Sequence, residues 1–154
     1  MIEYINLKKT PLGNICIAKS PKGLKYITIG APNKNWKKSR DNILLKTYDW
    51  LTSYFRGSID PIPDIELDEE DTDFRIKVWK KLRTIPYGKT ASYSDIAKKM
   101  NKPMSYRAVG QANKHNPLLI YTPCHRIIGK NSLGGFSSGG IKNKKILLSI
   151  ENAI

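Results

Sequence analysis

Apolar residues gather in three short runs near the start of the chain, over residues 2–7, 14–19 and 24–29, which are rich in Ile, Tyr and Leu. Short runs of this composition are typical of strands, and the turn residues 21–23 between the last two runs favour a hairpin. Over residues 39–55 the apolar positions instead recur at helical spacing. We therefore expect a small antiparallel sheet with one helix packed on it.

A cluster of acidic residues and prolines then interrupts the pattern. Eight Asp or Glu residues lie from Asp60 to Asp73, together with Pro61 and Pro63. This composition favours a solvated connector over a packed element. We predict an N-terminal α/β domain over residues 1–60, an acidic connector over 61–73 and a C-terminal domain over 74–154.

The remainder of the chain has the spacing of helices joined by short turns. Apolar residues at helical spacing predict a helix that begins at Thr72 or Asp73 and ends before Pro86. The predicted fold class is therefore α/β in the wider, α+β sense, with a mostly helical second half.

Two shorter helices are predicted next. Ser92 and Asp95 have the spacing of a capping box for a helix over residues 93–100, and Ser105 is placed to cap a helix over 106–114. Two short helices with a tight turn are typical of a helix-turn-helix, although helical hairpins are also common core elements.

Charge divides the chain at the same place. Residues 1–73 hold 11 Lys/Arg and 11 Asp/Glu, whereas residues 74–154 hold 16 and 2, so the whole formal excess of +14 lies in the second half. A basic half of this kind indicates a polyanionic partner, most often nucleic acid. A generally solvated lysine-rich surface is the alternative on charge alone.

The sequence disfavours both a membrane protein and a metal-binding protein. No apolar run approaches the roughly 20 residues that span a bilayer, and the first residues do not have a signal-peptide pattern, so we expect a compact cytoplasmic protein. Cys16 and Cys124 lie far apart without a Cys-x-x-Cys pair. Neither a disulfide framework nor a metal site is therefore predicted, and Cys16, in a strand-like apolar run, is expected to be a core thiol.

The stretch Pro123-Cys124-His125-Arg126 is the candidate for chemistry. It places a possible thiolate nucleophile beside a possible base, directly after the apolar run 118–121. Because free cysteine is among the most buried residue types, the tetrapeptide alone favours a packing role.

The order of motifs around this cysteine is more specific than any one of them. The motifs are Ser92-Tyr93-Ser94-Asp95-Ile96-Ala97, Arg107-Ala108-Val109-Gly110, Asn116-Pro117, residues 120–128, Gly134-Gly135-Phe136-Ser137 and residues 145–151. Together they resemble the O6-alkylguanine-DNA alkyltransferases, the methylated-DNA--protein-cysteine methyltransferases. The resemblance covers nearly all of residues 74–151, whereas residues 1–60 match the family's N-terminal domain only in kind.

The resemblance implies a fold, an activity and a partner. The second half would be a winged helix-turn-helix-like domain that carries the active site. The activity would be DNA repair by stoichiometric, irreversible transfer of a methyl or other alkyl group from O6 of guanine to Cys124. O4 of thymine is a candidate second position from which the alkyl group is removed. We expect a single-turnover enzyme that flips the nucleotide out of duplex DNA, needs no cofactor, binds no membrane and acts as a monomer.

The resemblance also implies roles for the residues around the thiol. His125 would act as the base, connected to Cys124 by a water, because adjacent side chains rarely point at each other. Glu151 would hold the imidazole tautomer, as the third member of a triad does. Asn116 would tie the turn that contains the cysteine to the helix-turn-helix.

DNA contacts and the base pocket follow in the same way. Arg107 matches the arginine that takes the vacated place in the base stack, and Tyr93 matches the tyrosine that pushes on the phosphate. Further DNA-binding residues are expected at Ser92, Ser94, Lys102, Ala108 and Gly110, and pocket residues at Ile127, Phe136 and Ser137.

One position departs from the family pattern. The family commonly has a tyrosine whose hydroxyl helps to protonate the departing guanine, and this chain has Phe136, in a loop that is one residue longer than usual. We expect Phe136 to cover the base by stacking and Phe136→Tyr to raise the transfer rate.

Two other functions compete with this interpretation. A non-enzymatic protein of the same fold would bind alkylated DNA as a damage sensor, but such relatives lack the reactive cysteine that is present here. A cysteine hydrolase fits poorly, because the other histidine, His115, lies in no plausible catalytic motif and is expected to be a surface or turn residue.

Overall fold

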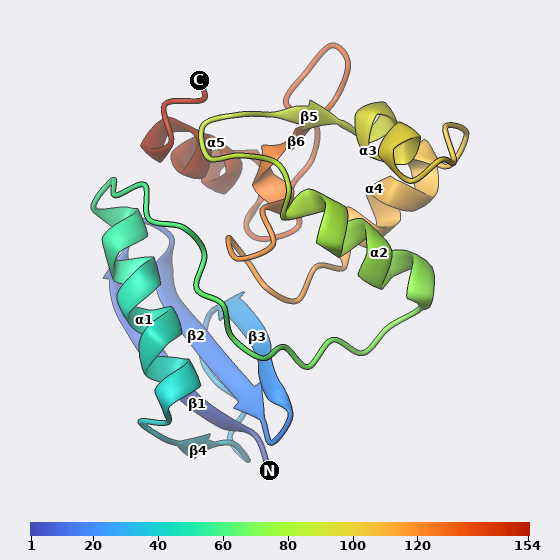
Figure 1. The fold of residues 1–154 in the computed structure, drawn as a ribbon. Coiled ribbons are helices and arrows are strands. Elements are labelled where there is room, and N and C mark those ends of the chain that lie inside the picture. Colours follow the sequence, from blue (N-terminus) through green and yellow to red (C-terminus); the bar gives the residue numbers. More distant parts are fainter. The chain divides into compact units, whose positions relative to one another are not determined.

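The computed structural model describes residues 1–154, which divide into two compact units, Met1–Glu69 and Glu70–Ile154. The elements of each unit are shown in Figure 1. A small antiparallel sheet and five α-helices make up most of the regular structure, which confirms the predicted α+β fold class. No helix is long and apolar enough to cross a membrane.

The first unit is a sheet with one helix on it. Its elements are β1 (Glu3–Thr10), β2 (Gly13–Ser20), β3 (Gly23–Ile29), β4 (Lys37–Lys38) and α1 (Asn42–Phe55). The strand order is β3-β2-β1-β4, with β1, β2 and β3 antiparallel and β4 parallel to β1. The three predicted strands and the predicted helix are confirmed.

Helix α1 covers one face of this sheet and closes its core. The Asp41 side chain accepts a hydrogen bond from the Ile43 N–H at 2.9 Å and so caps the helix start. Leu44 and Leu51 are fully buried on the face that packs against β1 and β2. Cys16, in β2, is also fully buried, and burial raises the pKa of its thiol to about 11, as expected of a core thiol.

The acidic connector is more ordered than its composition predicts. Leu67 forms a β-bridge with Leu24, and the Ser20 hydroxyl donates to the buried Asp68 carboxylate at 2.5 Å. A Cβ added at Gly23 would lie only 2.5 Å from the Glu66 carbonyl oxygen. The prediction of a solvated connector was therefore wrong for residues 66–68, because the absence of a side chain at Gly23 lets this backbone pair with β3.

The second unit consists of helices around one short parallel strand pair. Its elements are α2 (Asp73–Leu82), β5 (Ala91–Ser92), α3 (Tyr93–Lys99), α4 (Tyr106–Lys114), the 3-10 turn η1 (Cys124–Arg126), β6 (Ile127–Ile128) and α5 (Gly140–Ile150). Pairing of β5 with β6 joins the start of α3 to the segment that follows Cys124. The predicted helices over residues 73–85, 93–100 and 106–114 are confirmed to within three residues.

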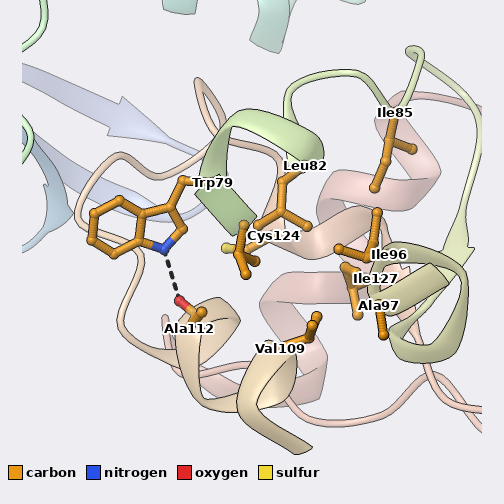
Figure 2. Packing of buried hydrophobic residues seen from close by; sticks show 10 residues of the cluster. Trp79, Leu82, Ile85, Ile96, Ala97, Val109, Ala112, Cys124 and Ile127 are labelled. Carbon is orange, nitrogen blue, oxygen red and sulfur yellow. Dashed lines mark hydrogen bonds between the residues drawn. The ribbon is translucent and has the colours of Figure 1, made fainter. Parts of the chain in front are cut away.

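The core of this unit brings α2, α3 and α4 together, as Figure 2 shows. Val78, Trp79 and Leu82 are buried on α2, and the Trp79 indole N–H donates to the Ala112 carbonyl at 2.8 Å. Cys124 belongs to the same cluster. The candidate nucleophile is therefore anchored in the packed centre of the unit rather than on a mobile surface loop.

Caps fix where two of these helices begin. The Thr72 hydroxyl accepts from the Arg75 N–H at 3.2 Å, so Thr72 is the cap of α2. Ser92 and Asp95 form the predicted capping box, with bonds of 3.0 and 2.9 Å. Each such cap stabilises its helix by about 1 kcal/mol.

Ser105 does not cap α4 in this way. It occupies the N-cap position, but its side chain makes no capping hydrogen bond. Its φ of −89° and ψ of 18° are not those of an extended backbone, which a capping side chain needs to reach the N2 or N3 amide. The predicted Ser105 cap was therefore wrong.

Candidate active site

Cys124 is held by a loop that Asn116 closes. The Asn116 side chain donates to the Thr122 carbonyl at 2.7 Å and accepts from the Leu118 N–H at 2.9 Å. These bonds join the end of α4 to the residues just before η1. Residues 118–127 are all buried, so the thiol is fixed by packing on every side of its backbone.

The Glu151 carboxylate lies at the end of α5 and is the hub of a buried polar network. It accepts from His125 Nε2 at 2.5 Å, from Arg126 Nε at 2.7 Å and Nη2 at 3.2 Å, and from the Gly88 N–H at 3.1 Å. Arg126 Nη1 also donates to the Ile85 carbonyl at 2.8 Å. A buried charge is tolerated when it is paired and fully hydrogen-bonded, and these donors meet both conditions.

This network fixes the tautomer of His125. The ring is fully buried, and burial lowers the pKa of the imidazole, which favours its neutral form. Since Nε2 faces the Glu151 carboxylate, the ring proton sits on Nε2. Nδ1 has no hydrogen-bond partner within the protein and keeps its lone pair free. The residue that follows Cys124 thus provides a buried hydrogen-bond acceptor, Nδ1 of His125.

A second set of groups acts on the thiol itself. Burial raises the pKa of Cys124 to about 11, while the Asn116 side chain, the Lys144 ammonium and nearby backbone amides act in the opposite direction. Lys144 is fully buried, donates to the carbonyls of Ile127 and Gly135, and has its pKa lowered by burial to about 8. The result is a positive charge next to a thiol that must ionise to react.

A cavity of about 310 Å³ adjoins this cluster. It is lined by Tyr93, Gly110, Asn113, Lys114, Gly135, Phe136 and Ser137. Gly134 has a φ of +73°, and a Cβ there would lie 3.2 Å from the Tyr93 hydroxyl, so the loop approaches Tyr93 because this residue is glycine. Burial and the proximity of Cys124 raise the pKa of Tyr93, which keeps its hydroxyl neutral.

Two of the three predicted pocket residues line this cavity. Phe136 and Ser137 are both in its wall, and the Ser137 hydroxyl donates to the Lys114 carbonyl at 2.9 Å. The Ile127 side chain is packed in the core and does not line this cavity; the prediction concerned backbone groups near Ile127 and stays a prediction. The Ile127 carbonyl accepts a hydrogen bond from Lys144.

The predicted DNA-binding residues lie on α3, α4 and the turn between them. Ser94, Lys102, Arg107 and Ala108 are exposed, and no carboxylate pairs with the Arg107 guanidinium. Tyr93 and Gly110 line the cavity, and the Ser92 hydroxyl is used in the capping box. The structure therefore separates an exposed basic face from the residues that shape the pocket.

Comparison with known proteins assigns the family. Residues 73–153 match the model of the 6-O-methylguanine DNA methyltransferase DNA-binding domain. The chain belongs to this family. A methylated-DNA--protein-cysteine methyltransferase of Methanosarcina barkeri is 40% identical over 96% of both chains, and one of Mycolicibacterium paratuberculosis is 47% identical over 98% of this chain and 93% of the relative.

A solved structure of a methyltransferase relative extends the likeness to the fold. The crystal structure of Mycobacterium tuberculosis OGT in complex with DNA has a TM-score of 0.85 and 38% identity, and covers 98% of this chain and 93% of that one. The match therefore includes the N-terminal unit as well as the helical one.

Three residues of this methyltransferase site were not predicted from the sequence. Arg126 forms an ion pair with Glu151, the charge of Lys144 lowers the pKa of the Cys124 thiol, and the Asn113 side chain donates to the Cys124 carbonyl at 3.4 Å. A signal for Lys144 exists, because it lies seven residues before Glu151 on the face of α5 that also carries the buried Leu147 and Leu148. A lysine in such an apolar stripe indicates a buried charge.

Proposed function

We propose that Cys124 is the residue that accepts the alkyl group. The chain is a DNA-repair methyltransferase, and its reaction transfers an alkyl group from DNA to a cysteine of the protein. Of its two cysteines, only Cys124 adjoins a free acceptor nitrogen and a positive charge. The Nδ1 atom of the buried His125, which has no hydrogen-bond partner in the protein, is the observation that carries this assignment.

His125 and Glu151 would generate the thiolate. Nδ1 of His125 takes the thiol proton through a bridging water, and the Glu151 carboxylate stabilises the imidazolium that forms at the other side of the ring. Arg126 holds that carboxylate in place through its ion pair. Lys144 and Asn116 then stabilise the negative sulfur, which offsets part of the cost of its burial.

The thiolate attacks the alkyl carbon in line with the C–O6 bond. A sulfur–carbon bond forms, the carbon–oxygen bond breaks, and its electron pair moves to guanine, which takes up one proton. The product is a thioether on Cys124. Because a thioether has no simple hydrolytic route back, each molecule reacts once and the repair is stoichiometric.

The basic face would hold the DNA. Arg107 and its neighbour Ala108 lie at the start of α4, where a small residue permits close approach to the minor groove. Lys102, Ser92 and Ser94 would contact phosphates, which orient the duplex without reading its sequence. Tyr93 and Arg107 would assist extrusion of the damaged nucleotide, at a cost of roughly a few kcal/mol for unstacking. A cytoplasmic location stays a prediction.

Intact mass measurement tests the assignment. The protein is incubated with a duplex that contains one O6-methylguanine, and with the same duplex that contains guanine. We expect a stoichiometric gain of one methyl with the first duplex only, located in the peptide that contains Cys124. Tight binding to the modified duplex with no gain of mass would instead support the damage-sensor function.

A further inference from the structure

The C-terminal unit has a second basic surface, which the proposed mechanism does not use. It is a groove of about 440 Å³ between α2 and the end of α3, here called the α2 groove, and it is lined by five lysines: Lys77, Lys80, Lys81, Lys99 and Lys102. Four of these lysines are exposed and Lys81 is half-buried. No Asp or Glu lines the groove, and none of the five forms an ion pair. The groove therefore presents several ammonium groups with no negative partner in the protein.

The stability of the helices does not account for this cluster. A lysine in the last turn of a helix interacts favourably with the helix dipole, which explains Lys80, Lys81 and Lys99. Lys77 lies one turn earlier and four residues before Lys81, a spacing at which like charges destabilise a helix. Lys102 lies in the turn after α3. A cluster of like charges that opposes folding and has no internal partner indicates an anionic ligand.

Phosphates of a nucleic-acid backbone are the anions that fit this groove. Lysine ammonium groups bind phosphate as point charges, without a fixed geometry. Lys77 and Lys81 are about 6 Å apart along α2, whereas charges follow each other every ~3.4 Å along one strand of DNA. Lys99 and Lys102 line the α3 side of the groove. Lysines on both sides can thus contact several phosphates of one backbone.

The α2 groove and the exposed face of α4 point in different directions. The Trp79 side chain of α2 points toward α4 and donates to the Ala112 carbonyl, as Figure 2 shows. Lys77 and Lys81 lie about 160° around α2 from Trp79, and the exposed Arg107 lies about 140° around α4 from Ala112. Each basic surface therefore faces away from the contact between the two helices. A straight duplex on the exposed face of α4 leaves the lysines of α2 free.

We propose that the α2 groove binds the phosphate backbone of a second DNA segment while the exposed face of α4 holds the first. The inference rests on the proposed function, which places the first segment on α4, and adds a second site to it. Phosphate contacts carry no sequence information, so the groove accepts undamaged DNA. A protein held by two segments can release either one. It therefore passes directly from one segment to another in its search for damaged bases.

Release of a fluorescent, undamaged duplex tests the second site. The protein is bound to the labelled duplex and then mixed with increasing concentrations of the same duplex without the label. We expect the release rate of wild type to rise at least about threefold with competitor, because a duplex held in the groove displaces the first one at high effective concentration. In Lys77→Gln/Lys80→Gln/Lys81→Gln the rate should not depend on competitor. A release rate of wild type that is constant overturns the inference.

A variant with the same loss of charge elsewhere is the matched control. Lys89, Lys142 and Lys145 are exposed in the same unit and do not line the groove. Lys89→Gln/Lys142→Gln/Lys145→Gln should therefore keep the dependence on competitor. Equal loss of this dependence in both triple variants would show an effect of total charge and overturn the inference. So would release from wild type that rises with polyglutamate but not with duplex, which would assign the groove to an acidic protein.

Methyl transfer is measured separately on the same proteins. At saturating O6-methylguanine duplex both triple variants should react within a few-fold of wild type, which shows that they are folded. Lys102 is left unchanged, because the proposed function assigns it to the first segment. Lys77→Gln/Lys81→Gln repeats the test if the groove variant does not fold. Failure of wild type to take the methyl group would overturn the proposed function, and the release measurement would still decide on the groove.

Discussion

The regions around the two cysteines show what separates a core thiol from a reagent. Cys16 in the N-terminal unit and Cys124 in the helical unit are 0% and 2% exposed, and burial raises both pKa values to about 11. Exposure and pKa therefore do not distinguish them. By those two measures either residue is an inert hydrophobic side chain.

The difference lies in the groups that oppose burial. For Cys16 burial is the only cause of the shift. Around Cys124, Asn116 and Lys144 lower the pKa of the thiol, and His125 offers a free acceptor. A buried cysteine is thus chemically competent when fixed polar groups are arranged for its ionised form, and the comparison can be tested one group at a time.

Exchanging the two thiols for hydroxyls should produce the largest contrast. Cys124→Ser should lower methyl transfer by at least about a thousandfold, because the serine hydroxyl is a far weaker nucleophile at neutral pH. Cys16→Ser should leave the transfer rate unchanged and lower the free energy of unfolding by about 1–3 kcal/mol, because it buries an unpaired hydroxyl. Single-turnover transfer and urea unfolding measure the two effects. Loss of transfer in Cys16→Ser, with the fold intact, would contradict the comparison.

The two histidines allow the same contrast for the base. His125→Leu should lower transfer by about a hundredfold to ten-thousandfold, the usual contribution of a general base, while Glu151 keeps its bonds to Arg126 and Gly88. His115 is exposed at the end of α4, with its ring nitrogen bonded to the Gln111 carbonyl, and His115→Leu is the matched control. Equal transfer rates for the two variants would remove His125 from the mechanism.

Lys144 should matter less and in a pH-dependent way. Its charge favours the Cys124 thiolate, so Lys144→Met should lower transfer about tenfold at pH 7, whereas the exposed neighbour variant Lys145→Met should not. The pKa of Lys144 is about 8, so the wild-type protein loses this charge as the pH rises above 8. The advantage of wild type over Lys144→Met should therefore be largest below pH 8 and shrink above it. A pH–rate profile with a constant ratio would show that Lys144 acts only in packing.

Much of the fold and of the candidate site was predictable, because local sequence patterns determine it. The apolar runs of β1 to β3, the Ser92–Asp95 capping box and the helices α3 and α4 follow from residue types and spacing within a few residues. The site residues Cys124, His125 and Glu151 were expected from the order of motifs. The structure joins His125 and Glu151 by a hydrogen bond of 2.5 Å and places Cys124 in the same 3-10 turn as His125, while their catalytic roles stay predictions.

What could not be predicted depends on contacts between distant residues. The bonds of Arg126 to Glu151 and of Asn113 to the Cys124 carbonyl join segments that no local pattern relates. The pairing of Leu67 with Leu24 was missed for the same reason, since an acidic composition describes the solvated side chains and not the backbone that passes Gly23. Ser105 failed as a cap because its backbone angles, not its hydroxyl, decide whether it can reach an amide.

A substitution at Phe136 should have the smallest effect. It distinguishes an effect on the reactivity of the thiol from an effect on the departure of guanine. The Phe136 ring lines the cavity, so Phe136→Tyr adds a hydroxyl that can donate a proton to the departing guanine without altering the groups around Cys124. We expect transfer from O6-methylguanine DNA to rise a few-fold, while the alkylation of Cys124 by iodoacetamide, which releases no guanine, stays unchanged. A parallel rise in both rates would mean that the hydroxyl acts on the thiol. An equal or slower transfer rate would show that the pocket already protonates guanine by another route.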